Sequence, residues 1–121
     1  MEAMANTIPN AATGPSTSPL AKAFIREQLL SQSPTGYIAN CRAIQHATPP
    51  DYSKVTCPML IIAGSVDKSA PLDGCKKIFG KLRTEEGKKR LEVLEGIGHW
   101  HCVEAPEEVG RLVREFCEGL A

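Results

Sequence analysis

The hydrophobic pattern of the chain changes near residue 50, from helical spacing to short continuous apolar runs. Before that point, Ser-Pro pairs at 18–19 and 33–34 precede apolar residues that recur every three or four positions. Serine at the N-cap with proline at the first helical position is a typical helix start, so helices are predicted over residues 19–32 and 34–47. Residues 1–17, which are rich in Ala, Thr, Ser, Asn, Pro and Gly, are predicted to be irregular.

Two apolar runs in the second half of the chain predict buried strands. Residues 59–63, with the sequence MLIIA, show no alternation, which favours a strand of a parallel sheet that helices cover on both faces. Residues 91–94 are also apolar enough for burial. Amphipathic helices are expected over residues 71–82 and 106–120, and the second has the clearest apolar stripe of the chain. This order of strand, helix, strand and helix predicts an α/β fold with parallel strands and a right-handed crossover.

A sheet of two parallel strands is incomplete on its own. Its outer edges leave backbone N–H and C=O groups unpaired, and two strands with two helices cannot cover both faces. The pattern therefore indicates that the sheet continues with strands outside these 121 residues.

Charge and cysteine usage narrow the class of protein. Fourteen basic residues balance fourteen acidic ones, so no attraction to nucleic acid or to an anionic membrane is expected. No apolar run approaches the roughly 18 residues of a membrane span, and the N-terminus lacks the basic and then apolar order of a secretory signal. The five cysteines are widely spaced without a C-x-x-C, which favours reduced thiols and a cytoplasmic protein, with Cys41, Cys75 and Cys117 in the core.

Asp67 and His99 each follow one of the predicted strands. Functional residues of open α/β sheets gather at the carboxyl ends of the strands, where adjacent parallel strands would bring these two loops together. An Asp that accepts a hydrogen bond from a His ring nitrogen fixes the tautomer and stabilises the imidazolium that forms during acyl transfer. Taken singly, Asp67 is more simply a cap for the helix near Pro71 and His99 a surface histidine; together they favour catalysis.

Both loops lie in stretches that resemble the motifs of α/β-hydrolases. Residues 57–71, CPMLIIAGSVDKSAP, are similar to the late-strand motif of that family: a proline, an apolar strand, G-x-x-D, and a proline that opens a helix. Residues 96–109, GIGHWHCVEAPEEV, are similar to its closing motif, G-H followed by E-x-P-x-x-V and the final helix. The chain order in the family is serine, acid, histidine, so the resemblance implies Asp67 as the acid and His99 as the base of a triad.

The resemblance extends upstream. Residues 36–44, with Asp51 and Tyr52 before the first strand, are similar to the cap-to-core junction of 3-oxoadipate enol-lactonase-like members. The implied organisation is an irregular segment (1–17), a helical cap remnant (18–50) and the C-terminal part of an α/β-hydrolase core (51–121). The implied activity is hydrolysis of a small carboxylic ester or lactone, without a cofactor.

The nucleophile of that family has no counterpart in this chain. The elbow G-x-S-x-G is absent, and the nearest string, GPSTS at residues 14–18, lacks the final glycine and follows no buried strand. The early oxyanion loop is missing too. We therefore expect a C-terminal fragment of a hydrolase that is inactive alone. The alternative is a truncated, non-catalytic interaction or binding module, which would self-associate through its exposed strand edge.

The residues around His99 keep more than one interpretation. Trp100 either lines a substrate pocket or packs as part of the core. His101 is expected to pack or hydrogen-bond near the pocket. His99, His101 and Cys102 lack the paired spacing of zinc sites, so no metal is predicted. Glu104 is expected in a salt bridge or at a helix start rather than as the acid partner.

Overall fold

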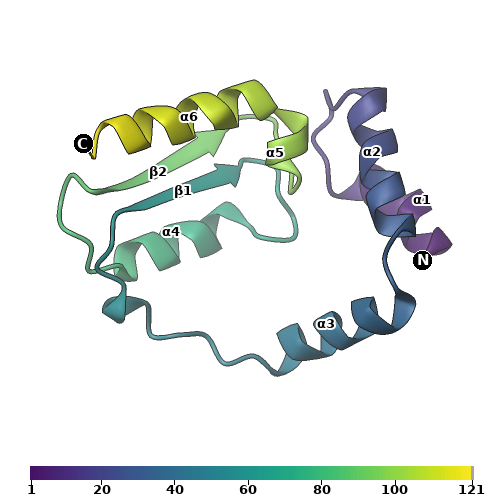
Figure 1. Cartoon of the computed structure of the whole chain (residues 1–121), viewed down its shortest axis with the longest axis horizontal. Coiled ribbons are helices and arrows are strands. Elements are labelled where there is room, and N and C mark those ends of the chain that lie inside the picture. The colour runs from purple at the N-terminus through teal and green to yellow at the C-terminus, as the bar shows by residue number, and fades with distance from the viewer. Residues whose placement is uncertain (121) are drawn as a thin grey trace.

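The computed structural model describes residues 1–120, so Ala121, the last residue of the predicted core segment 51–121, lies outside the described residues. Figure 1 shows the elements in chain order. They are α1 (Glu2–Ala11), α2 (Pro19–Leu30), α3 (Pro34–His46), the 3-10 turn η1 (Tyr52–Lys54), β1 (Met59–Gly64), α4 (Leu72–Lys81), β2 (Lys89–Leu94), α5 (His101–Glu104) and α6 (Pro106–Glu118). The predicted order of strand, helix, strand and helix is present, and the short helix α5 is an addition to it.

The sheet consists of two parallel strands. Met59 lies opposite Lys89 and Gly64 opposite Leu94, and Figure 1 shows the strands between α4 and α6. The strand β2 begins two residues earlier than predicted, because Lys89 and Arg90 are polar and hide the strand from a hydrophobic pattern. Lys89 lies over the ring of Phe79, which keeps this polar residue at the edge of the apolar layer. The carboxyl ends of both strands therefore lie at the same end of the sheet.

The prediction that residues 1–17 are irregular is wrong for residues 2–11, which form α1. This helix has no side-chain cap and contains Pro9, so local signals are weak. Its stability comes from packing, because Ala5 is buried against Ile25 and Leu29 of α2 in a shared apolar cluster. A contact between two segments of the chain overrides the composition of the first.

The predicted starts of α2 and α3 are confirmed. The hydroxyl of Ser18 accepts a hydrogen bond from the N–H of Ala21, and that of Ser33 from the N–H of Gly36. The helices end at Leu30 and His46, two residues and one residue earlier than expected.

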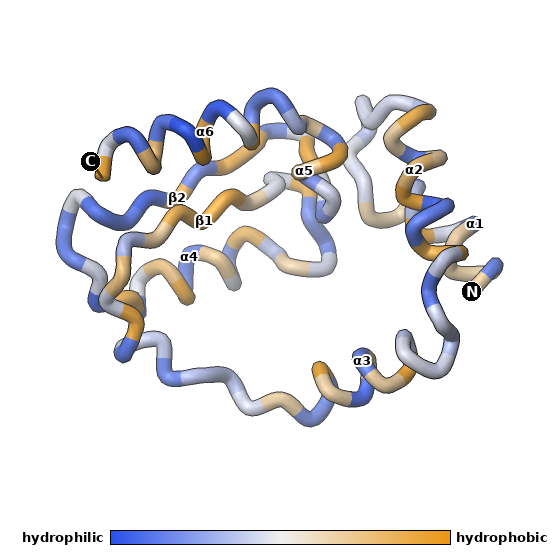
Figure 2. The backbone as a smooth tube through the Cα atoms, in the orientation of Figure 1, coloured by the Kyte–Doolittle hydropathy of each residue, from blue (hydrophilic) through white to orange (hydrophobic). Residues whose placement is uncertain are grey.

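Helix α3 differs from α2 in that none of its side chains is buried. Figure 2 shows apolar segments along it, and Ile38 and Ile44 are 53% and 76% exposed. The expectation that Cys41 and Cys117 lie in the core is wrong, because both are exposed, while Cys75 is half-buried. The exposed apolar residues of α3 and α6 would lie in a core only if residues beyond those described covered them.

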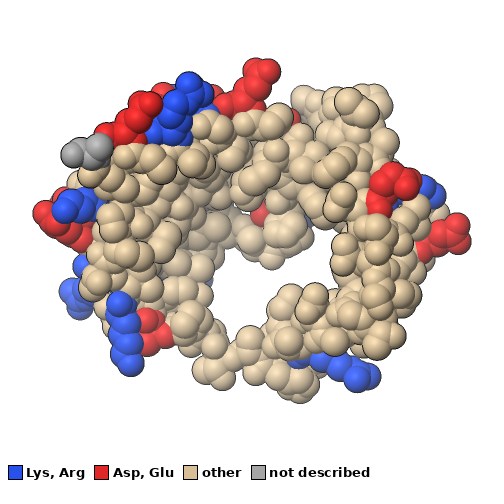
Figure 3. Space-filling model, in the orientation of Figure 1, with Lys and Arg blue, Asp and Glu red and all other residues tan. Residues whose placement is uncertain are grey.

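The molecule has far more surface than a compact protein of its mass. It exposes 8148 Å², whereas about 6,400 Å² is typical of a folded monomer of 13.1 kDa. Figure 3 shows the reason, an opening that passes through the space-filling surface. Over residues 1–120, no helix is long and apolar enough to cross a membrane.

Candidate active site

The structure brings Asp67 and His99 together at the carboxyl ends of the two strands. Oδ2 of Asp67 lies 2.9 Å from Nδ1 of His99. The side chain of Asp67 is 5% exposed, while that of His99 is 46% exposed. The acid is therefore inside the protein and the imidazole at its surface. Over residues 1–120, no hydrogen bond engages Nε2 of His99, the ring nitrogen on the far side from Asp67.

The two carboxylate oxygens of Asp67 have different partners. Oδ1 accepts hydrogen bonds from the N–H groups of Ser69, at 2.7 Å, and Ala70, at 2.9 Å, in the turn that leads to α4. Oδ2 is left for His99. The interpretation of Asp67 as a cap of α4 is wrong, because that helix begins after Pro71 without a side-chain cap. The carboxylate instead stabilises the turn before the helix and contacts the histidine. Its role as a catalytic acid stays a prediction.

The same contacts set the ionisation of Asp67. Burial acts to raise the pKa of the carboxyl, because a charge inside the protein loses hydration. The hydrogen bonds from Ala70, His99 and Ser69 outweigh burial, so the pKa lies below its ordinary value. Asp67 is therefore a carboxylate at neutral pH, which is the form that accepts a proton-bearing Nδ1.

Glycines allow the two loops to approach this closely. A Cβ at Gly64 would overlap the carbonyl oxygens of Ile97 and Gly98, and a Cβ at Gly98 would lie 2.6 Å from the carbonyl oxygen of Ala12. The N–H of Val66 also donates to the carbonyl of Ile97, at 3.1 Å. The glycines of the G-x-x-D and G-H motifs thus have a packing reason, because the backbones on each side touch.

A cavity of about 410 Å³ lies beside His99. It is lined by Ile8, Ala12, Gln28, Leu29, Gln32, Tyr37, Asn40, Ser69, His99 and Trp100. The three N-terminal helices and the loops that join them supply most of this wall, so they lie next to the imidazole. Trp100 lines the cavity and packs against the apolar cluster of α1 and α2. A role in binding substrate stays a prediction.

Two polar atoms near the cavity lack partners. Among the described residues, Nε1 of Trp100 and Nδ1 of His101 are buried without a hydrogen bond. His101 is half-buried, and among residues 1–120 it makes no hydrogen bond to Asp67 or His99. No group of His, Cys, Asp or Glu within residues 1–120 is arranged to hold a metal ion.

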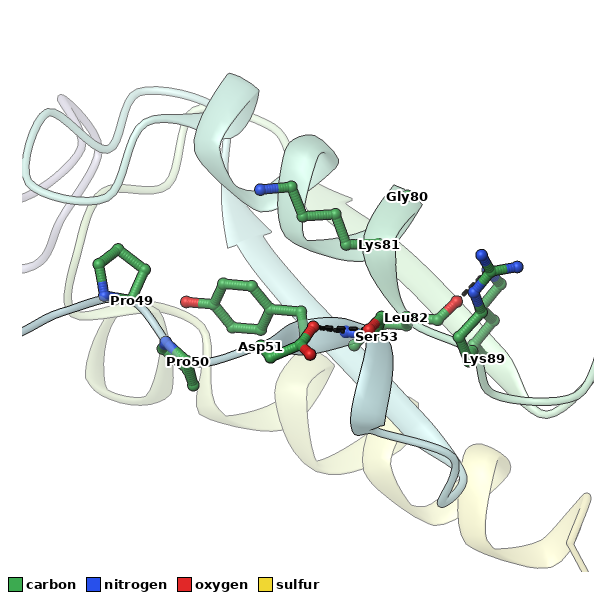
Figure 4. A pocket seen from close by; sticks show the side chains of 10 residues that line it. Pro49, Pro50, Asp51, Ser53, Gly80, Lys81, Leu82 and Lys89 are labelled. Atoms are coloured by element: carbon green, nitrogen blue, oxygen red, sulfur yellow. Dashed lines mark hydrogen bonds between the residues drawn. The ribbon is translucent and has the colours of Figure 1, made fainter.

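A second cavity, of about 710 Å³, lies at the amino ends of the strands. Figure 4 shows it between residues 49–53, the end of α4 and Lys89. Its only carboxylate, Asp51, accepts hydrogen bonds from Ser53, and Lys89 donates to the carbonyl of Leu82. Neither Asp67 nor His99 lines this cavity.

The described residues place no serine against the histidine. Ser16, in the string GPSTS, is exposed in the loop between α1 and α2, and it follows a helix instead of a strand. Ser69 lines the cavity, but its recorded hydrogen bond is from its backbone N–H to Asp67. The geometry within residues 1–120 is therefore that of an acid and a base.

Glu104 has a wider role than sequence reasoning expected. Among residues 1–120 it forms no salt bridge, but its carboxylate accepts a hydrogen bond from the N–H of Trp100, the residue at the start of α5. The same carboxylate also accepts hydrogen bonds from Gly98 and from Gly14 and Thr17. The E-x-P motif was the signal that this position matters. The partners in residues 14–17 lie too far away in the sequence for that motif to reveal them.

Comparison with known proteins identifies the fold. No protein-family model matches the sequence, and no curated protein matches it. A serine hydrolase involved in carbazole degradation is 18% identical with a TM-score of 0.78, covering 98% of this chain and 47% of its own. A thermophilic esterase from Thermogutta terrifontis, solved with malate, is 21% identical with a TM-score of 0.80, covering 95% of this chain and 43% of its own. The chain spans less than half the length of each, and it has a partial α/β-hydrolase fold.

Proposed function

We propose that this chain supplies the acid and the base of a serine hydrolase that acts on a carboxylic ester or a lactone. The observation that carries the proposal is the 2.9 Å contact between Oδ2 of Asp67 and Nδ1 of His99, at the carboxyl ends of two parallel strands. The fold shared with a serine hydrolase and an esterase supports it. The nucleophilic serine comes from a polypeptide segment outside these residues.

The chemistry follows from the tautomer that Asp67 selects. Because its carboxylate accepts from Nδ1–H, Nε2 of His99 carries a lone pair and accepts the serine proton as the serine oxygen attacks the carbonyl carbon. The imidazolium that forms is stabilised by the buried carboxylate. It then returns the proton to the alkoxide leaving group, which leaves an acyl-serine for water to hydrolyse by the same exchange of a proton.

The substrate lies in the cavity of about 410 Å³ in front of His99. Its apolar wall, from Ile8, Leu29 and Trp100, suits the acyl or alcohol part of an ester. Trp100 lines this cavity, which supports a substrate-binding role for this residue. A lactone is the cyclic form of the same reacting group.

Activity on a p-nitrophenyl ester tests the proposal. The chain alone is expected to give no turnover above that of buffer. The coding sequence upstream of Met1 is the source to examine for the serine, and an in-frame buried strand followed by G-x-S-x-G supports the proposal.

In the protein extended by that segment, His99→Ala is expected to abolish turnover. Asp67→Asn is expected to lower kcat by about 10⁴-fold, because the wrong imidazole tautomer is then favoured. Turnover by the chain alone that disappears in His99→Ala would contradict the need for an outside serine. Full activity of the extended His99→Ala protein would contradict the whole assignment.

A further inference from the structure

Glu104 connects the segment around His99 to the beginning of the chain. Its Oε2 accepts hydrogen bonds from the N–H of Gly14 at 2.6 Å, the hydroxyl of Thr17 at 2.7 Å and the N–H of Gly98 at 3.1 Å. Its Oε1 accepts from the N–H of Trp100 at 3.0 Å. One carboxylate therefore binds four donors in two segments, and the first of these begins 90 positions before Glu104 in the sequence.

The two donors in the histidine loop are the neighbours of His99 on either side. The N–H of His99 itself donates to the carbonyl of Ala12, at 2.8 Å. Three consecutive amides, those of Gly98, His99 and Trp100, thus all have acceptors, two on the side chain of Glu104 and one on the backbone of Ala12. Fixing these amides fixes the Cα–Cβ direction of His99, so that few positions of its ring remain.

We propose that Glu104 is a positioning residue: by binding the backbone on both sides of His99 and tying it to residues 14–17, its carboxylate holds the imidazole in contact with Asp67. The inference rests on the proposed function, which takes His99 as the base. It adds a second support that acts on the histidine through its backbone, while Asp67 acts on its ring.

A glutamate side chain suits this position better than glutamine or aspartate. All four partners are donors, and the residues described contain no cation within an ion pair of Glu104, so the charge is balanced by N–H and O–H groups alone. A glutamine has one acceptor oxygen, and its NH₂ would face an N–H or O–H donor. An aspartate is one methylene shorter and does not reach both segments.

The test is made by NMR on the full chain uniformly labelled with ¹⁵N, which reports both the ring of His99 and the backbone amides. The Nδ1 proton of His99, held by a carboxylate, gives a downfield signal in the wild type. Glu104→Gln is expected to lose this signal and to exchange the amides of residues 98–100 about fivefold faster or more, because each lost hydrogen bond is worth about 1 kcal/mol. Glu107→Gln is the matched control: its side chain is exposed and makes no hydrogen bond among residues 1–120, so both readouts are expected to stay as in the wild type.

Measurements below the melting temperature distinguish the positioning role of Glu104 from a role in stability alone. It would lower the melting temperature of Glu104→Gln but leave the His99 signal unchanged below the melt, and that result would overturn the proposal. If Glu104→Gln does not fold, Thr17→Val removes one donor to the same oxygen and is expected to weaken the signal and the protection of the Gly98 amide. A folded Thr17→Val with the wild-type signal and wild-type exchange would also overturn it. Neither readout needs turnover, so failure here is distinct from failure of the proposed hydrolase activity.

Discussion

The carboxylate of Asp67 has its position fixed before any substrate arrives. Two backbone N–H groups hold Oδ1 in the turn before α4, and Oδ2 is thereby aimed at His99. Groups that are oriented in advance cost no rearrangement when charge develops on the imidazole. Because Asp67 is 5% exposed, water competes little for either oxygen.

The stability that Asp67 contributes depends on pH. Its folded-state pKa lies below the unfolded value of about 3.9, so its contribution is present at neutral pH and is lost as the pH falls through the folded value. Urea unfolding at pH 7 and pH 3 is expected to show a smaller loss of stability in Asp67→Asn than in the wild type. Asp73→Asn, at an exposed position of α4, is the control and should lose as much stability between pH 7 and pH 3 as the wild type. An equal loss of stability in Asp67→Asn and the wild type would contradict this prediction.

The close backbone contact at Gly98 gives a second prediction. Alanine at this position puts a Cβ 2.6 Å from the carbonyl oxygen of Ala12, which is expected to cost about 1–3 kcal/mol of unfolding free energy. Gly110 of α6 has open space around it, so Gly110→Ala should stabilise by about 0.5–1 kcal/mol. Chemical denaturation of both variants measures these two changes in unfolding free energy. A neutral Gly98→Ala would mean that the loops separate without cost.

At the level of elements, the sequence predicts what local signals determine. The starts of α2 and α3 follow from Ser-Pro pairs, and β1 from a continuous apolar run. Asp67 and His99 follow from the strand ends. The local pattern does not predict helix α1, whose stability comes from contact with α2, or the bonds of Glu104 to Gly14 and Thr17. Both are contacts between distant segments, which no local pattern contains.

Helix α3 has a consequence for local stability. Its 13 residues bury no side chain, whereas α2 buries three, including Ile25. An isolated helix of this length is marginal in water, since helix formation relies on packing. Hydrogen exchange of the chain is expected to show rapid exchange across the middle of α3 and slow exchange around Ile25. Equal protection of the two helices would show that something covers α3.

At the level of the whole molecule, the surface is the dominant feature. The excess over a compact protein of this mass is roughly 1,700 Å², about twice what one partner buries in a standard protein interface. The unpaired edges of the two strands and the apolar side chains of α3 contribute to it. This area is what a further part of the sheet, carrying the serine, would cover.

Self-association through the free edge of β1 is a prediction for the chain alone. The N–H groups of Met59 and Ser65 donate toward β2, so by the alternation of a strand that of Ile62 points to the other edge. Sedimentation velocity is expected to show a sedimentation coefficient that rises with concentration. Ile62→Pro should reduce this, because proline is tolerated at an edge facing away from the ladder, whereas Ile61→Pro should unfold the chain. A monomer at all concentrations would contradict the prediction.

The opening through the molecule has a consequence for how activity would be controlled. If covering that surface is what stabilises the fold, then binding and folding share one equilibrium, and a covering segment present at 100 times its dissociation constant adds about 2.7 kcal/mol. The population of chains with Asp67 and His99 in contact would then rise with the amount of that segment. Supplied in trans, the segment would act as a titratable activator, and the rate of ester hydrolysis would report its concentration by mass action.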